Sequence, residues 1–204
     1  LVQLREGEAT TTLLMFLYSF LAMTSYNIIK PLTRSEFISS LGADNMPYLF
    51  LALGVLIGVI MQGYTKLISP VPRRWMIPVT QLGIVGVLFG FWVLAGLGNQ
   101  WVEVAFYLFG QIYGVLLISQ FWTLANLIYD ARAAKRLFGF IGAGSSLGGV
   151  TGGAITTLAV EFVGNRNLLL VSAVMLAVCA GLVVAILGRG RGVELAGIEE
   201  AGKE

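Results

Sequence analysis

Apolar and polar positions are sorted along this chain into long blocks. Six stretches of at least 21 residues contain no Asp, Glu, Lys or Arg, and they lie at 9–29, 45–65, 75–102, 104–129, 137–160 and 167–188. A helix that crosses a bilayer needs about 20 mostly apolar residues, whereas the strands of a membrane barrel alternate over about ten. The pattern therefore predicts an all-α polytopic membrane protein, a bundle of six transmembrane helices.

The spaces between these stretches predict how the chain is divided. The expected spans are approximately 10–31, 46–68, 75–97, 101–128, 137–161 and 167–188. Most connections are short, and short connections make neighbouring helices antiparallel. We therefore expect one transmembrane bundle over 1–190, followed by a Gly- and Glu-rich cytoplasmic linker or tail over 191–204.

Composition narrows the chemistry that the chain can perform. Apolar residues make up 57% of the chain and charged residues 12%, against about 25% charged in a soluble domain. Histidine is absent and Cys179 is the single cysteine, so a His/Cys metal site and a His-dependent triad are both excluded. No acid–base set converges in the pattern, so we expect no enzyme, catalytic residue, metal or cofactor. The expected partner is the lipid bilayer, with no nucleic acid.

The placement of Lys and Arg predicts the orientation of the spans. Ten of the 13 basic residues lie in the tails and in the even-numbered connections, and only Lys30, Arg34 and Arg166 lie on the other side. Cytoplasmic loops carry the excess of Lys and Arg. Both termini are therefore expected in the cytoplasm.

Glycines recur every four residues in the fifth expected span. One row contains Gly144, Gly148 and Gly152, and a second contains Gly149 and Gly153. Small residues at this spacing let helices approach one another closely in lipid. We expect these five glycines to form a helix-packing surface, with a mobile seam as the alternative. The second to fourth spans repeat the pattern at Gly54 and Gly58, Gly86 and Gly90, and Gly110 and Gly114.

Polar side chains at membrane depth mark either a bundle interior or a transport pathway. In the fourth span, a stripe within about a 60° sector of the helix contains Ser119, Thr123, Asn126 and Asp130. Gln111 and Gln120 flank this stripe. Hydrogen bonds between helices would explain these residues as well as a pathway would, and the pattern leaves both interpretations open.

The end of the first span combines two cations with a proline. Asn27, Lys30 and Arg34 share a face if the helix continues. Pro31 is expected to kink or break the helix, because proline cannot donate to the carbonyl of Asn27. Two cations beside a freed carbonyl would suit an anionic group of a transported solute. Alternatively, Lys30 reaches the outer interface, or nearby acids neutralise the cations, namely Glu36, Glu103 and Glu161.

Several motifs in the first, fourth and fifth spans resemble a known transporter family. Those in the fourth and fifth spans are Phe121-Trp122-x-x-Ala125-Asn126, Ala134-Lys135-Arg136-x-Phe138 and Ile141-Gly142-x-Gly144. They resemble the signature of the ATP/ADP translocase family, the nucleotide exchangers of plastids and obligate intracellular bacteria. Lys30-Pro31-x-x-Arg34 and Ser146-Leu147-Gly148-Gly149 resemble its free-living bacterial relatives more closely. The resemblance covers roughly 10–190.

This family is similar in fold to the major facilitator superfamily, with twelve spans in two six-span halves. The resemblance implies that the chain is the N-terminal half of such a transporter, in a bacterial inner membrane, with a second six-span half in the same gene or in a partner chain. It implies a secondary transporter, ATP/ADP antiport-like, for nucleotides or a related anionic solute. The family's nucleotide exchangers carry acidic residues near the positions of Gln111 and Leu127, so the exact solute stays open.

The resemblance also implies roles for single residues. Lys30 corresponds to the family's nucleotide-binding lysine and Arg34 to its neighbouring arginine, and Asn126 would line the cavity. The further substrate-binding candidates are Asn27, Gln111 and Gln120. The gating candidates on the cytoplasmic side are Asp130, Lys135 and Arg136. A transporter-derived module that no longer transports and an accessory subunit of a larger membrane complex are the alternative functions.

Overall fold

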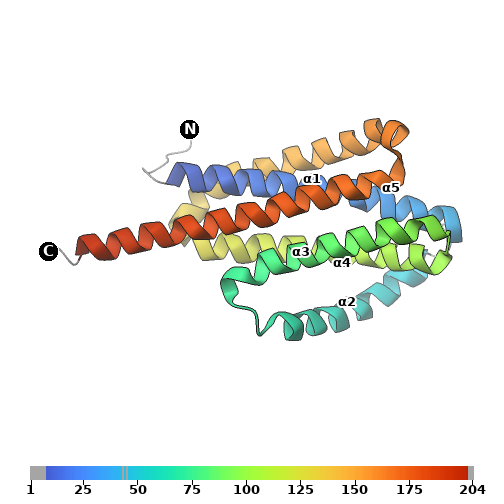
Figure 1. The fold of residues 1–204 in the computed structure, drawn as a ribbon, viewed down its shortest axis with the longest axis horizontal. Coiled ribbons are helices and arrows are strands. Elements are labelled where there is room, and N and C mark those ends of the chain that lie inside the picture. The colour runs from blue at the N-terminus through green and yellow to red at the C-terminus, as the bar shows by residue number, and fades with distance from the viewer. Residues whose placement is uncertain (1–7, 43, 45, 202–204) are drawn as a thin grey trace.

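The structure, a computed structural model, describes residues 8–42, 44 and 46–201, and over these residues it is all-helical. In chain order the elements are α1 (Glu8–Leu41), α2 (Met46–Ile68), α3 (Arg73–Leu94), the 3-10 helix η2 (Ala95–Leu97), α4 (Gln100–Ile128) and α5 (Ala131–Ala201). Figure 1 shows the helices aligned along one long axis, with the beginning of α1 and the end of α5 on the same side.

α5 consists of two helical segments joined at Gly164. This glycine has φ 77° and ψ 154°, a backbone conformation that essentially only glycine adopts. The chain reverses there, so that residues 165–201 run back along the bundle against the direction of residues 131–163 (Figure 1). The spans expected at 137–161 and 167–188 each fall within one of these two segments.

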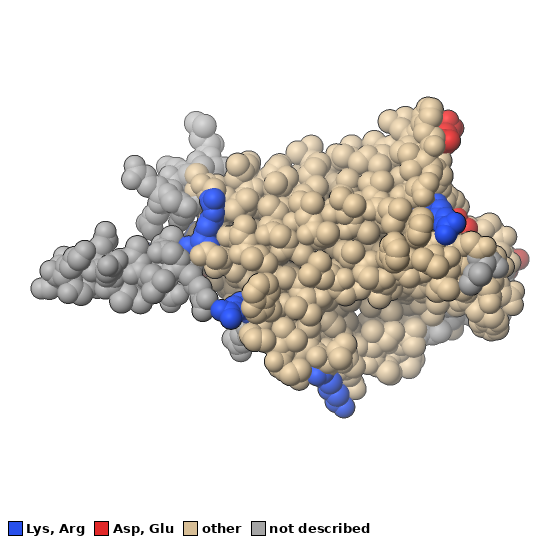
Figure 2. Space-filling model, in the orientation of Figure 1, with Lys and Arg blue, Asp and Glu red and all other residues tan. Residues whose placement is uncertain are grey.

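The surface of the bundle is that of an integral membrane protein. Within the described residues, four helices are long and apolar enough to cross a membrane, namely α1, α3, α4 and α5, while the apolar stretch found in α2, Leu53–Ile68, is shorter. Figure 2 shows most of the charged side chains near the two ends and one basic side chain at the lower edge, while the middle of the visible face carries no charge. Val55, Val150 and Phe162 are 73%, 74% and 89% exposed, which is stable in contact with lipid.

The two ends of the bundle differ in charge. One end, called here the basic end, holds the end of α2 with Lys66, the start of α3 with Arg74 and the start of α5 with Lys135. The other end, called the Gly164 end, holds the end of α1, the start of α4 and the reversal of α5.

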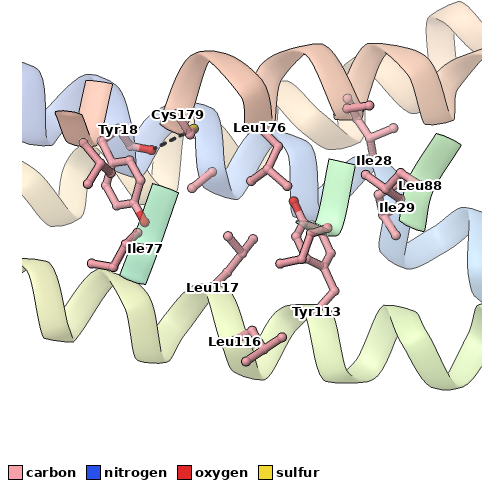
Figure 3. Close-up of a cluster of buried hydrophobic side chains, with 14 of the residues drawn as sticks. Tyr18, Ile28, Ile29, Ile77, Leu88, Tyr113, Leu116, Leu117, Leu176 and Cys179 are labelled. Atoms are coloured by element: carbon pink, nitrogen blue, oxygen red, sulfur yellow. Dashed lines mark hydrogen bonds between the residues drawn. The ribbon is translucent and has the colours of Figure 1, made fainter. Parts of the chain in front are cut away.

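Buried hydrogen bonds connect α1 to the rest of the bundle. In α1, the Tyr18 hydroxyl accepts a hydrogen bond of 3.0 Å from Gln81 of α3, and the Ser25 hydroxyl lies 2.7 Å from that of Tyr113 in α4. Ser25 also donates to the carbonyl of Ser172 in the second segment of α5. Figure 3 shows Tyr18 and Tyr113 among packed aliphatic side chains of α1, α3, α4 and α5. The core therefore joins α1 to three other helical elements.

Three boundaries differ from the sequence-based expectations. α1 does not end at Pro31 but continues to Leu41. The first segment of α5 begins at Ala131 rather than near 137, and residues 191–201, expected as a linker, are helical. The remaining residues of that expected linker, 202–204, lie outside the described part of the chain.

Packing explains why the proline does not end α1. Residues on both sides of Pro31 are held against α4, since Tyr26 contacts Gly114 and Thr33 contacts Gly110. The Thr33 hydroxyl also donates to the carbonyl of Lys30 at 3.0 Å. The helix therefore loses one backbone hydrogen bond at Pro31 but keeps its tertiary contacts.

Candidate functional site

One face of α1 is fixed by a row of α5 glycines, Gly144, Gly148 and Gly152. A methyl group on Gly144 would lie 2.7 Å from a carbonyl oxygen of α1, and one on Gly152 would lie 2.6 Å from another. A methyl group on Gly148 would collide with the carbonyl of Phe20. The two helices run parallel here, because the contacting residues of α1 and α5 increase in number together. Their backbones touch with no room for side chains.

The other glycines have different surroundings. A methyl group on Gly149 would lie 3.7 Å from the Asn27 amide nitrogen, and one on Gly153 would meet no described atom within 4 Å. Methyl groups on Gly110 and Gly114 of α4 would lie 2.8 Å and 2.7 Å from side chains of α1. No described atom lies within 4 Å of such a group at the glycine pairs of α2 and α3, which are Gly54, Gly58, Gly86 and Gly90. Among the described glycines, close approach to another helix is therefore found only between α1 and its neighbours α4 and α5.

The two cations of α1 are exposed on this fixed helix. The Lys30 ammonium lies 5.8 Å from the centroid of the Tyr26 ring. Among the described residues, no carboxylate oxygen lies within 4 Å of the charged nitrogens of Lys30 or Arg34. Asn27 is half-buried on the same face, and its amide donates to the carbonyl of Met23 at 2.8 Å. The cations are thus not neutralised by acids that the structure describes.

The polar residues of α4 lie at different depths relative to Lys30. Gly114 of α4 contacts Tyr26 of α1, and Gly110 contacts Thr33, so the two helices are antiparallel. Lys30 lies about one turn beyond Tyr26 on α1, and Gln111 lies about one turn before Gly114 on α4, so both lie at one level. By the same rise of about 1.5 Å per residue, Asn126, 15 residues further along α4 than Gln111, lies about 22 Å away from that level. The structure therefore brings Gln111 and Lys30 to one level and separates Asn126 from them.

Two further α4 residues differ in their hydrogen bonding. Gln120 is 3% exposed, and neither atom of its amide group has a hydrogen-bond partner among the described residues. The Thr123 hydroxyl donates to the carbonyl of Ser119 at 2.8 Å, within its own helix. This bond of the polar stripe does not join two helices.

The gating candidates lie at the basic end. Asp130 is exposed, and its carboxylate accepts a hydrogen bond of 2.7 Å from the backbone N–H of Ala133. Asp130 therefore caps the start of α5, as an aspartate before a helix commonly does. Lys135 is exposed, and the next residue of α5, Arg136, is half-buried.

A cavity at the Gly164 end was not expected from the sequence. It has a volume of about 150 Å³ and lies between α1, α3, α4 and the second segment of α5. Its polar lining residues are Glu36, Glu103, Asn165 and Arg166. The sequence pattern placed three of them near span ends on one side, but only the packing of four helical elements shows that they surround one space.

Comparison with known proteins assigns the chain to a family. The model of the family described as TLC ATP/ADP transporter matches residues 80–190, which is 111 of 204 residues. The matched region contains the close-packed glycine row, the polar residues of α4 and the reversal at Gly164. No curated protein and no solved structure matches the chain significantly. Because the family model covers more than half of the sequence, the chain belongs to the TLC ATP/ADP transporter family of membrane transporters.

Proposed function

We propose that the chain is the N-terminal six-helix half of a secondary transporter for nucleotides or a related anionic solute. The observation that carries this proposal is the pair of exposed cations on α1, Lys30 and Arg34, without a described carboxylate within 4 Å. Ionisable groups within membrane helices are costly and are found mainly where they act on a substrate or ion. A nucleotide phosphate entering from water would supply the missing negative charge.

Lys30 is the centre of the proposed binding site. Gln111 lies at its level on the neighbouring helix, and Asn27 lies one turn away on α1. Gln120 and Asn126 lie progressively nearer the basic end, so we place them along the route of the solute. Asp130, Lys135 and Arg136 would form the gate where this route reaches the basic end.

The proposed half contains six membrane crossings. α2 is 23 residues long, about 34 Å, and the two segments of α5 supply two crossings. With the basic end in the cytoplasm, both termini lie on the cytoplasmic side of a bacterial inner membrane. Access would alternate as this half rocks against a second six-span half, as in the major facilitator arrangement.

The test is nucleotide counterflow by the full-length protein in liposomes. Lys30→Ala removes a charge-assisted contact worth about 1.5–3 kcal/mol, so nucleotide affinity should fall about 10- to 150-fold. Lys30→Arg should rescue affinity only in part, because a planar guanidinium does not replace a point charge. Lys66→Ala, an exposed cation at the basic end, is the matched control and should bind as the wild type does.

Two results would contradict this assignment. If Lys30 only reaches the interface, Lys30→Arg should be silent and Lys30→Gln nearly so. Equal affinity in Lys30→Ala and wild type would therefore remove Lys30 from the mechanism.

A second candidate function is a membrane module that no longer transports. The second segment of α5, 165–201, is about 55 Å long, whereas the hydrocarbon core of a bilayer is about 30 Å thick. A continuous helix of this length can connect the bundle rigidly to a soluble partner. A wild-type protein that binds no nucleotide would favour this function, or that of an accessory subunit, over transport.

A further inference from the structure

The cavity at the Gly164 end is built by side chains that hold one another in place. The Asn165 amide donates to a carboxylate oxygen of Glu36 at 2.8 Å and so joins α5 to α1. Arg166 donates from Nε to the carbonyl of Trp92 at 2.7 Å, and its guanidinium carbon lies 4.6 Å from the centroid of the Trp92 ring. These contacts fix Glu36, Asn165 and Arg166 at the wall of the cavity.

One lining group lacks a partner. The Oε2 atom of Glu103 is buried and has no hydrogen-bond partner among the described residues. A carboxylate oxygen removed from water without a donor or a cation is strongly unfavourable. Arg166 also lines the cavity, but no described carboxylate lies within 4 Å of its charged nitrogens. Arg166 instead contacts the carbonyl and the ring of Trp92.

The charge of the lining fits one positive charge. The carboxylates of Glu36 and Glu103 and the guanidinium of Arg166 sum to −1, so a monovalent cation balances the cavity while a divalent one leaves an excess. Lys30 and Arg34 are absent from the lining. A volume of about 150 Å³ corresponds to about five water molecules at about 30 Å³ each, which is enough for a partly hydrated ion.

We propose that this cavity binds one small monovalent inorganic cation, with Na⁺ as the probe for its test. Oxygen ligands would come from Glu103, from Glu36 and from the side-chain carbonyl of Asn165, whose amide nitrogen is already used to donate to Glu36. Water would complete the coordination. The site is separate from the anion site of the proposed function. A bound ion would connect the end of α1, the start of α4 and the start of the second segment of α5.

The test measures sodium binding by the purified full-length protein without nucleotide. Thermal unfolding is followed in NaCl and in choline chloride at equal ionic strength, together with equilibrium binding of radioactive sodium. At about tenfold above the dissociation constant, Na⁺ should raise the melting temperature by about 3–6 °C. Glu103→Gln and Glu36→Gln should lose both the shift and the sodium binding.

Glu161→Gln is the matched control, since Glu161 is an exposed acid of the same end that does not line the cavity, and it should keep the shift. In choline chloride, Glu103→Gln should melt at or above the temperature of the wild type, because it removes the charge of a half-buried carboxylate whose Oε2 atom has no described partner. Lys30→Ala should also keep the shift, which separates this site from the anion site. Wild type without sodium binding, Glu103→Gln with full binding, or a shift produced by Ca²⁺ alone would overturn the proposal.

Discussion

At the scale of single residues, two glycines of α5 have opposite surroundings. Gly148 lies against the Phe20 backbone, whereas Gly153 faces open space. We expect Gly148→Ala to destabilise the bundle by about 1–3 kcal/mol, because the added methyl must push two backbones apart. Gly153→Ala should be neutral or stabilise by up to about 1 kcal/mol through helix propensity. Thermal unfolding in detergent measures both variants. Equal destabilisation by the two would show that backbone contact is not what Gly148 provides.

Asp130 gives a second prediction at this scale. Its carboxylate accepts the Ala133 N–H, so Asp130→Ala should cost about 1 kcal/mol of stability and Asp130→Asn, which can still cap the helix, much less. Melting temperatures of the two variants check this. If Asp130→Asn keeps the wild-type stability but abolishes counterflow, the charge of Asp130 acts in gating in addition to its capping role.

At the scale of helices, the reversal of α5 depends on Gly164. Its φ of 77° and ψ of 154° lie in a region that other residues populate only with strain. Gly164→Ala should therefore destabilise the protein by about 1–3 kcal/mol, although a methyl group there would meet no described atom within 4 Å. Thermal unfolding of Gly164→Ala is compared with that of Gly153→Ala. A methyl group meets no described atom within 4 Å at either position, and of the two only Gly164 has a positive φ, so a difference in stability reports backbone strain. A Gly164→Ala variant as stable as the wild type would mean that this turn adopts another conformation.

The helices also show what a sequence pattern can and cannot predict. The ends of α2, α3 and α4 lie within a few residues of the expected boundaries, because charges and turn residues bound their apolar runs. The continuation of α1 past Pro31 was missed, because contacts with α4 hold the helix on both sides of the proline. Such contacts join residues about 80 positions apart, and local spacing contains no information about them.

For the candidate sites too, the sequence predicted some features and missed others. The sequence identified Lys30 as a cation at the end of a span, since that follows from residue type and position. It could not place Gln111 at the level of Lys30 and Asn126 about 22 Å away, because this follows from the contact between Gly114 and Tyr26. The cavity around Glu103 was missed for the same reason, since its wall comes from four helical elements.

At the scale of the whole molecule, the basic end is expected to face the cytoplasm. Lys135 and Glu161 are exposed near opposite ends of the first segment of α5. A cysteine at Glu161 should react with a membrane-impermeant maleimide added to intact cells, and a cysteine at Lys135 should react only after the cells are opened. The native Cys179 is buried and should stay unlabelled. Labelling of both positions from outside would contradict the orientation.

The contact between α1 and α5 has a consequence for movement. The carbonyl oxygens of Phe16, Phe20 and Thr24 approach three glycines of α5 at matching intervals of four residues. Such close approach is suited to weak Cα–H···O bonds, repeated about every 6 Å along the axis. An axial slide shorter than one such interval would drive these oxygens against the side chains between the glycines. These repeated contacts oppose sliding of one helix along the other. We therefore expect α1 and the first segment of α5 to move together as one rigid unit.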